Sequence, residues 1–335
     1  MDKCNIRFAE YEDIPAIMQY INDYWRNNHI LARDRELFKW QYVSDNKVNF
    51  VLGVDKADQI QGIIGYIPYD DSDEKDIALA LWKANSIKES PFLGVELLVF
   101  LMKNLKYSRI VCTGINIDTT KKIYEFLGIK TGLMKQWYRL SRMTKYSIGE
   151  IRNYDIPDKR DNIIRNDICL CESFEEAESR FDFDKYRESN NQPYKSRTYV
   201  KKRYYHHPSY DYKVYSILNQ DNKNVALLVL RIQEYECARI IRLIDLIGDV
   251  KHLEGLTEAL DRLLIEFGAE YIDLYETGIP DDILYEGGWL PVKDSGNIIP
   301  NYFAPYVREN IDIYYSSSDK DIILFRGDGD QDRPN

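Results

Sequence analysis

The chain of 335 residues carries one short motif twice, as TGINID at residues 113–118 and as TGIPDD at residues 277–282. Each copy ends an apolar run typical of a strand and leads into a stretch that closes on a glycine. The flanking glycines are fourteen residues apart in the first copy (Gly114 and Gly128) and ten apart in the second (Gly278 and Gly288). Because four residues make about one helical turn, the shorter copy keeps the same helix face inward. The repeat therefore predicts two related domains in tandem.

The order of predicted elements also supports two domains. Apolar periodicity in the first half predicts β-α-α-β-β-β-α-β-α-β-β, including a strongly apolar helix at 92–105 and a helix with two strands within 118–140. The second half repeats the scheme, with strands at 166–173, 224–232, 238–247 and 269–279 and a helix at 252–268. We predict an α/β fold in which each domain has a mixed, mostly antiparallel sheet flanked by helices. The predicted segments are an N-terminal domain 1–145, a linker 146–165, a C-terminal domain 166–327 and an acidic tail 328–335.

One domain of this kind followed by an unrelated α/β domain is the alternative, which the matching motifs disfavour. The formal charge of −10 argues against a general nucleic-acid partner, which needs a basic surface. No apolar run reaches the length of a membrane span, and the N-terminus lacks the apolar core of a signal peptide, so we expect a cytoplasmic protein. The five cysteines lack the paired spacing of a zinc site, and no metal is expected.

The segment DTTKKIYEFLGIKTGLMKQWYRL (118–140) and the element order resemble the GNAT superfamily of acetyl-CoA-dependent N-acyltransferases. As an order of elements, the resemblance spans nearly the whole chain. It implies acetyl-CoA or another acyl-CoA as cosubstrate and a small-molecule amine as acceptor. In this family the strand before the main helix ends in a motif like R/Q-x-x-G-x-G/A, whose backbone N–H groups and helix N-terminus hold the coenzyme pyrophosphate.

Neither half keeps that motif intact. In KESPFLGVELL (88–98) only Gly94 matches a small residue of the motif, while Pro91 lacks an N–H donor and Glu89 would repel phosphate. The second half has DLIGDVKHLEGLTEAL at 245–260. The resemblance implies these cofactor-binding candidates: Lys88, Gly94, Gly248, Lys251 and Gly255.

The family transfers the acyl group by direct attack of the amine on the thioester. A backbone N–H of the fourth strand polarises the carbonyl, and a tyrosine often protonates the leaving thiolate. The resemblance places that tyrosine at Tyr124, or at Tyr285 in the second half, although each suits a core position with its hydroxyl at the rim. Glu89, Asp245 and Glu276 lie near the ends of predicted strands and are candidates for the general base. Each of these carboxylates also fits a solvated loop.

Two further stretches suggest binding surfaces. The segment NIIPNYFAPYVREN (297–310) gathers Tyr302, Phe303 and Tyr306 in a proline-stiffened loop, which suits either stacking on a carbohydrate acceptor or plugging of a domain interface. The tail 328–335 alternates acidic residues. Its terminal position favours disorder, and folding back onto a basic partner is the alternative.

The sequence therefore predicts an acyl-CoA-dependent N-acyltransferase that acts on an amino group, such as that of an amino sugar or nucleotide amino sugar. The tail and the aromatic loop also look like those of uncharacterised tandem-GNAT proteins of bacterial surface-polysaccharide clusters. A Fem-like transferase that uses aminoacyl-tRNA is one alternative, favoured by the missing glycine motif. A noncatalytic binding or assembly protein is another, favoured by Pro91 and Phe92.

Overall fold

The computed structural model describes residues 3–44, 46–143, 145–154, 165–188 and 191–334. Within it the chain forms two compact units. Unit 1 consists of Met1–Thr131, Ser316–Asp319 and Arg333–Asn335, and unit 2 consists of Gly132–Tyr315 and Lys320–Asp332. Both units have a mixed sheet flanked by helices, which confirms the predicted architecture. The predicted boundary within 146–165 stays a prediction, since residues 155–164 lie outside the described residues.

The sheet of unit 1 has the strand order β1-β3-β4-β5-β6-β17-β7, with β2 paired to β3. Strands β1, β3, β4 and β5 are antiparallel neighbours, whereas β5 and β6 run parallel. Strand β3 is buried along most of its length, as expected where both faces of a sheet are covered. The strand bounds are β1 Asn5–Ala9, β2 Val43–Ser44, β3 Lys47–Val54, β4 Ile60–Pro68, β5 Lys75–Ala84, β6 Tyr107–Thr113, β7 Lys130–Leu133 and β17 Tyr314–Ser317.

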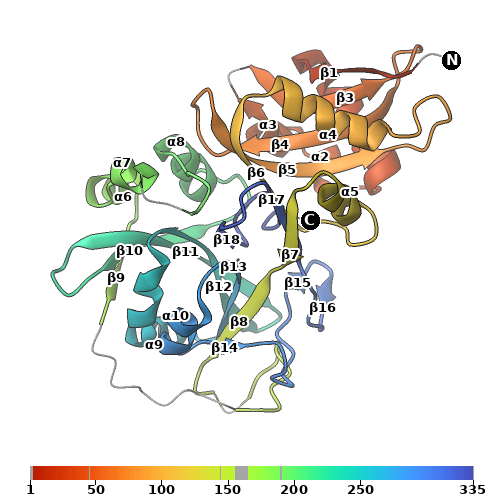
Figure 1. Cartoon of the computed structure of the whole chain (residues 1–335). Coiled ribbons are helices and arrows are strands. Elements are labelled where there is room, and N and C mark those ends of the chain that lie inside the picture. The colour runs from red at the N-terminus through yellow and green to blue at the C-terminus, as the bar shows by residue number, and fades with distance from the viewer. Residues whose placement is uncertain (1–2, 45, 144, 155–164, 189–190, 335) are drawn as a thin grey trace. The chain divides into compact units, whose positions relative to one another are not determined.

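Helix α4 packs across β3 and β4 (Figure 1). Two glycines permit this close approach: a Cβ atom at Gly53 would lie 2.6 Å from Leu93 Cδ1, and one at Gly62 would lie 2.9 Å from Leu97 Cδ1. Because these two positions carry no side chain, leucines of α4 pack directly on the backbone of β3 and β4. The helices of unit 1 are α1 Ile14–Tyr20, α2 Ile30–Arg33, α3 Arg35–Tyr42, α4 Leu93–Asn104 and α5 Thr120–Phe126.

The sheet of unit 2 has the order β14-β8-β13-β12-β11-β10-β9, with β18 paired to β13. Here β12 and β13 form the parallel pair. The strand bounds are β8 Lys135–Leu140, β9 Asp167–Leu170, β10 Tyr212–Leu218, β11 Asn224–Tyr235, β12 Ala238–Gly248, β13 Ala269–Thr277, β14 Leu290–Pro291 and β18 Leu324–Phe325; β15 Tyr302–Phe303 and β16 Tyr306–Val307 form a separate two-stranded sheet. The helices are α6 Phe174–Arg180, α7 Phe183–Glu188, α8 Arg197–Val200, α9 Thr257–Phe267 and α10 Asp281–Glu286.

Helix α9 builds the main apolar core of unit 2. Its buried residues recur at helical spacing, and Leu260 and Leu263 belong to one cluster with Leu228 of β11 and Leu243 of β12. The helix ends at Gly268, whose φ of 58° is the left-handed conformation common at helix C-termini. Because side chains alternate along a strand, the residues between these positions face the other side of the sheet, where the polar groups described below lie.

The strand beside each parallel pair comes from a distant part of the chain. Strand β17, near the C-terminus, stands between β6 and β7, and β8 stands between β13 and β14. The sequence predicts β8 as the last strand of the N-terminal domain, and the structure corrects this: β8 pairs with β13 from Tyr271↔Leu140 to Glu276↔Lys135. Four of its six residues are buried, so the strand suits an interior place in the sheet of unit 2.

The part of the predicted linker that the structure describes also packs in unit 2. The backbone N–H groups of Ser147 and Ile148 donate to the Glu270 carboxylate of β13, at 2.5 and 2.9 Å, and Ile148 is fully buried. Residues 147–149 therefore act as part of the unit, and the prediction of a linker does not hold for them.

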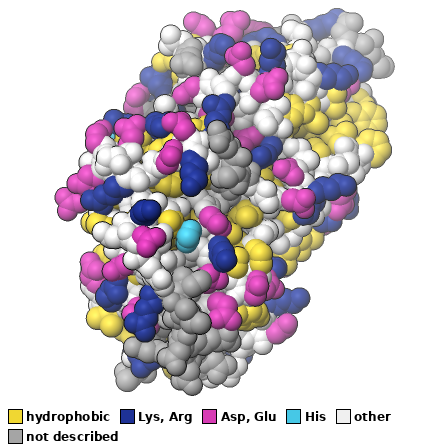
Figure 2. Space-filling model, turned by 60° about the vertical axis from the view of Figure 1, so that its left-hand side comes forward, with side chains coloured by type: hydrophobic (Ala, Val, Ile, Leu, Met, Phe, Trp, Pro, Cys, Tyr) yellow, Lys and Arg dark blue, Asp and Glu magenta, His cyan; other side chains and the backbone are white. Residues whose placement is uncertain are grey.

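Charges are mixed on the face drawn in Figure 2, where lysine and arginine alternate with aspartate and glutamate among the described side chains. No helix in the described ranges is long and apolar enough to cross a lipid bilayer.

Candidate functional site

The parallel strand pair in each unit opens before its strands end. In unit 1, β5 and β6 are in register only as far as Ala78↔Val111, although β5 continues to Ala84. In unit 2, the register between β12 and β13 ends at Leu243↔Leu274, although β12 continues to Gly248. We call these openings the first fork and the second fork. Strands that part expose backbone N–H and C=O groups on their inner edges, and such groups need partners.

The first fork keeps the inner edge of β5 open. From Leu79 to Ala84 this strand pairs with β4, and no strand within the described residues pairs with its other edge. A bulge interrupts the strand at Leu81, whose φ is 48°. The backbone groups of this edge are therefore placed to pair with an extended ligand.

Trp82 and Tyr124 lie together in unit 1 beside the first fork. The indole Nε1 of Trp82 donates to the carbonyl oxygen of Gly94 in α4 at 3.1 Å. The Trp82 and Tyr124 rings meet edge to face, with centroids 5.5 Å apart. Tyr124 is only 1% exposed, and this burial, together with neighbouring Cys112, raises the pKa of its hydroxyl well above the usual value. The phenol is therefore neutral near pH 7 and retains a proton to give.

The turn before α4 offers few anion partners. Lys88, Glu89 and Pro91 are exposed, and Phe92 is 71% exposed at the helix N-cap. Gly94 is not required by packing, because a Cβ atom there would lie 3.6 Å from Ala84 Cβ, an ordinary contact. Glu89 is thus a solvated carboxylate, and Lys88 is the nearby predicted residue that is free to reach a phosphate.

The C-terminal segment fills the second fork. Strand β18 pairs with β13 at Glu276↔Phe325 and Thr277↔Leu324. Beyond it, the Arg326 N–H donates to the Tyr275 carbonyl of β13 at 3.2 Å, and the Gly327 N–H donates to the Ile244 carbonyl of β12 at 2.7 Å. The segment therefore forms hydrogen bonds to both strands of the second fork. The corresponding edge of β5 in the first fork has no such strand beside it among the described residues.

A buried ion triad locks this segment. Lys195 Nζ lies 2.6 Å from an oxygen of Asp245 and 3.0 Å from an oxygen of Asp328, and all three side chains are fully buried. Tyr204 donates its hydroxyl to the other Asp245 oxygen at 2.5 Å. Asp245, predicted as a candidate base at a cleft, is therefore a structural ion-pair partner, because a lysine distant in sequence folds onto it.

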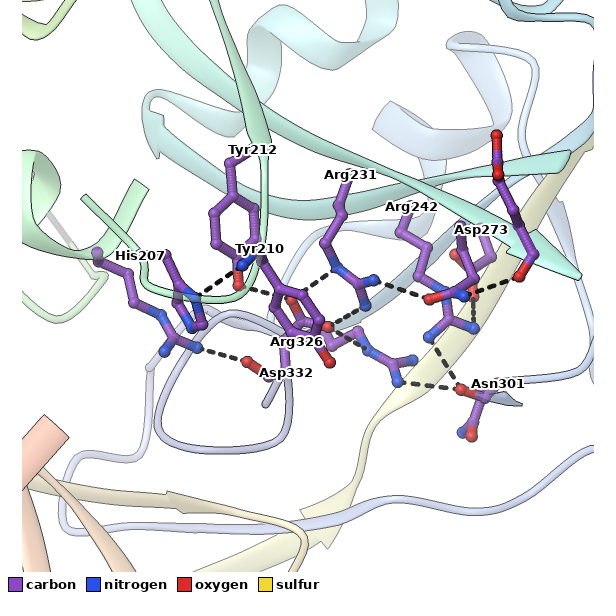
Figure 3. A network of polar contacts seen from close by, with 12 residues as sticks. His207, Tyr210, Tyr212, Arg231, Arg242, Asp273, Asn301, Arg326 and Asp332 are labelled. Atoms are coloured by element: carbon purple, nitrogen blue, oxygen red, sulfur yellow. Dashed lines mark hydrogen bonds and ion pairs between the residues drawn. The ribbon is translucent and has the colours of Figure 1, made fainter. Parts of the chain in front are cut away.

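Three aspartates of the acidic tail, Asp328, Asp330 and Asp332, are buried, contrary to the favoured prediction of disorder. Figure 3 shows Asp332 among arginines on the sheet face opposite α9. An Asp332 oxygen lies 2.7 Å from Arg231 Nη2 and 3.6 Å from Arg326 Nε. Although burial acts in the opposite direction, these arginines hold the pKa of Asp332 well below its usual value. The alternative, a tail that folds back onto a basic partner, is what the structure shows.

Arg242 and Asp273 extend the same network (Figure 3). Their side chains lie 3.5 Å apart, both 2% exposed. Burial, with repulsion from Arg326, lowers the pKa of Arg242 to about 10. Its Nη groups donate to the carbonyl oxygens of Asn301 and Pro300 at 2.9 and 3.2 Å, so the network also fixes the loop before β15.

Of the three residues of unit 2 that were predicted to bind the coenzyme, two are packed in the interior and one is exposed. Gly255 packs against Asn166, whose Nδ2 would lie 2.8 Å from an added Cβ, and Gly248 packs against Ala226 with a φ of 130°. The side chain of Lys251 is exposed. None of these three positions needs a coenzyme to explain it.

Tyr302, Phe303 and Tyr306 are used inside unit 2. The Tyr306 ring stacks on Tyr235 at a centroid distance of 3.9 Å, and its hydroxyl donates to the Ile148 carbonyl at 2.6 Å. Arg242 lies over the Phe303 ring, 4.8 Å from its centroid. Tyr302 is half-buried. These contacts match the packing alternative for the aromatic loop more closely than an open sugar platform.

Glu276 and Tyr285 both contact Trp137. The fully buried Glu276 carboxylate accepts from Trp137 Nε1 at 2.9 Å and from the Ile279 N–H at 3.0 Å. Burial raises the pKa of Glu276 to about 7. Tyr285 meets the Trp137 ring edge to face at 5.2 Å and is 43% exposed. It lines a cavity of about 880 Å³ that belongs wholly to unit 2.

Sequence reasoning missed Trp82, Lys195 and the arginine network. Nothing near Lys195 in sequence marks it as buried, and its partners lie 50 residues or more away. Among the residues that the structure describes, no group of His, Cys, Asp and Glu side chains is arranged to hold a metal ion.

The two sheets, each with one parallel pair and a main helix on one face, define a tandem GNAT-like fold. A solved structure from Enterococcus faecalis V583, described as a conserved protein of unknown function and probable N-acyltransferase, has a TM-score of 0.59 at 9% identity and covers 94% of this chain and 72% of its own. A GCN5-related N-acetyltransferase from Anabaena variabilis ATCC 29413 has a TM-score of 0.53 at 8% identity, with 93% and 72% covered. At these identities the likeness shows the fold alone. No protein-family model and no curated protein matches the sequence.

Proposed function

We propose that the protein transfers an acyl group from an acyl-CoA thioester to an amino group of a small molecule, and that the donor binds at the first fork. The open inner edge of β5 is the observation that carries this proposal. The GNAT-like fold of both units supports it. The second fork is excluded as donor site because the chain's own segment 324–327 already pairs there.

The reaction is a direct displacement. The amine nitrogen forms a bond to the thioester carbon while a backbone N–H of β5 stabilises the developing oxyanion, and the carbon–sulfur bond then breaks. Tyr124, which is protonated at neutral pH, gives its proton to the leaving thiolate as the carbon–sulfur bond breaks, and it regains a proton from solvent before the next cycle. The proton lost by the amine passes through water to an exposed base, for which Glu89 is the predicted residue in unit 1.

The acceptor that we propose is an amino sugar, and the role that we propose for the protein is in surface-polysaccharide synthesis. A noncatalytic binding protein is the second candidate. The exposed turn with Glu89 and Pro91 favours it, because this turn offers a coenzyme pyrophosphate little charge or hydrogen bonding. The net charge of −10 weighs against a tRNA-dependent transferase.

Calorimetric titration with acetyl-CoA and with free CoA tests the proposal. Gly94→Glu places a carboxylate where the donor phosphates would approach the N-terminus of α4, and we expect it to weaken binding at least about tenfold, or about 1.4 kcal/mol. The site has room for a side chain, so the variant should fold. Lys251→Glu also introduces a carboxylate, with a charge change of −2 against −1, at an exposed position of unit 2 and serves as the control, with unchanged affinity expected.

Absence of binding to the wild-type protein at millimolar acetyl-CoA would overturn the donor assignment and favour the noncatalytic protein. Equal weakening by Gly94→Glu and Lys251→Glu would remove the first fork as the site. Gly255→Glu is a poor control, since its side chain would collide with Asn166.

A further inference from the structure

Trp82 spans the opening of the first fork. It lies on β5 beyond Ala78↔Val111, the last pair that this strand forms with β6. Helix α4 follows β5 in the chain and α5 follows β6, and the indole contacts both helices. Its Nε1 donates to the Gly94 carbonyl of α4 at 3.1 Å, and its ring meets Tyr124 of α5 edge to face. The side chain therefore bridges the two helices that follow the parting strands.

The surface beside this indole is accessible, and small residues line it. Trp82, Ala84 and Gly94 are each half-buried. A Cβ atom added at Gly94 would lie 3.6 Å from Ala84 Cβ and 3.7 Å from Trp82 Nε1, so the three residues adjoin one another. A broad ring beside two residues with little or no side chain offers a ligand apolar contact at small cost in side-chain entropy.

The inner edge of β5 and the indole of Trp82 offer complementary contacts. The backbone groups of this edge form hydrogen bonds with amides, whereas an aromatic ring packs on alkyl groups. The arm of coenzyme A that carries the thioester is a chain of amide groups joined by short alkyl segments. A ligand of this chemistry uses both contacts when it lies along β5.

We propose that Trp82 contacts the acyl-CoA donor at the first fork. Its ring packs against the thioester-bearing arm, and its indole N–H keeps the first turn of α4 in place beside that arm. The assignment rests on the proposed function and adds to it a residue that determines how tightly the donor binds. It gives Trp82 no proton transfer and no bond-breaking step.

Titration of the full chain with acetyl-CoA tests this contact, with calorimetry and indole fluorescence recorded on the same samples. We expect the emission to change along with the heat, because the donor covers the partly exposed ring of Trp82. Trp82→Phe keeps an aromatic ring and removes the indole, so it should abolish most of the emission change and weaken binding about fivefold, or about 1 kcal/mol. Trp82→Ala removes the ring as well and should weaken binding at least about tenfold, or about 1.4 kcal/mol.

Trp40 provides the matched control. It is a half-buried tryptophan of unit 1 on α3, and α3 packs on Phe50 of β3, whereas α4 packs on Gly53 of the same strand. Residues three apart on a strand face opposite sides of the sheet, so Trp40 lies away from the face on which Trp82 contacts α4. Trp40→Phe should keep both the emission change and the affinity of the wild type. Equal loss of the emission change in Trp40→Phe and Trp82→Phe, in chains with wild-type melting temperature, would exclude Trp82 as the donor contact.

The outcomes separate this assignment from the proposed function. Absence of heat with the wild-type protein at millimolar acetyl-CoA would remove donor binding and the role of Trp82 together. Heat without an emission change, or with an emission change that Trp82→Phe retains, would overturn the role of Trp82 alone. Wild-type affinity in Trp82→Ala would do the same.

Discussion

Glu276 carries its carboxyl group into the interior of unit 2, where two N–H donors meet it and no cation contacts it closely. Trp137 Nε1 and the Ile279 N–H hold the charged form, and the partly exposed Lys135 adds a weaker attraction. Desolvation nevertheless dominates and raises the pKa of Glu276 from 4.5 to about 7. This group therefore takes up a proton on folding anywhere between these two values.

The free energy of unfolding of unit 2 should therefore depend on pH through the protonation of Glu276. Because the folded state binds more protons than the unfolded state, the free energy of unfolding falls as pH rises from 4.5 to about 7 and then levels off. Glu276→Gln removes this slope, and the variant should gain on the wild type across that window by up to about 3 kcal/mol.

Chemical denaturation of both proteins at several pH values measures this difference. Glu266→Gln, on the exposed side of α9, is the control and should follow the wild-type curve. A constant offset between Glu276→Gln and wild type from pH 5 to pH 8 would show that Glu276 does not titrate in this range.

Residue roles were predictable where they depend on local sequence and not where they depend on distant partners. Tyr124 was predicted from its own segment to lie on a helix, either as a catalytic residue or as a core residue. It lies buried on α5, as the core alternative requires. Asp245 was located correctly at a strand end. Its ion pair with Lys195 joins residues 50 positions apart, and no pattern within either segment signals that contact.

At the scale of elements, β8 shows what holds the sheet of unit 2 together. It pairs with β13 on one edge and with β14 on the other, so its loss would expose backbone groups on both neighbours. Trp137, 1% exposed, carries its side chain into the main core beside α9. An interior strand of a sheet contributes to folding even though it comes from another part of the chain.

Trp137→Ala should therefore destabilise unit 2 by about 3–5 kcal/mol through the cavity that it leaves. Hydrogen exchange followed by mass spectrometry should show faster exchange in β13 and β14. Leu133→Ala, at a 43% exposed position of β7, is the control and should cost little. Faster exchange confined to β3 and β4 of unit 1 would contradict the assignment of β8 to the sheet of unit 2.

Element prediction succeeded where periodicity was strong. The helix predicted at 92–105 is α4, Leu93–Asn104. The helix predicted at 252–268 is a 3-10 turn over Val250–Gly255 followed by α9, and it breaks where Gly255 packs tightly on Asn166. The exchanged places of β8 and β17 could not be predicted, because strand pairing between distant segments has no signature within either one.

At the scale of the whole molecule, the two units share a fold and differ at their forks. The first fork leaves the β5 edge open, while the second is bridged by a segment whose following aspartates, Asp328 and Asp332, form buried ion pairs with Lys195 and Arg231. Loss of one partner of such a pair is costly because the other charge stays buried.

Strands β8 and β17 also link the two halves of the chain, because each stands in the sheet formed mainly by the other half. A chain cut between Tyr154 and Arg165 yields an N-terminal piece that contains β8, which belongs to the sheet of unit 2, and a C-terminal piece that contains β17, which stands in the sheet of unit 1. Each piece alone would lack an interior strand of its own sheet. We expect the cut chain to remain associated in native buffer, because separation would break both strand pairings.

A protease site inserted between these residues tests this expectation, with size-exclusion chromatography before and after cleavage and circular dichroism of each purified piece. The pieces should elute together when native, separate in urea, and recover their cooperative melting only when mixed. The uncut insertion protein is the control for the insertion itself. If the pieces separated in native buffer and each melted cooperatively, β8 and β17 would contribute little to the sheets that they join, and each half would be an independent domain in the sense that the sequence first suggested.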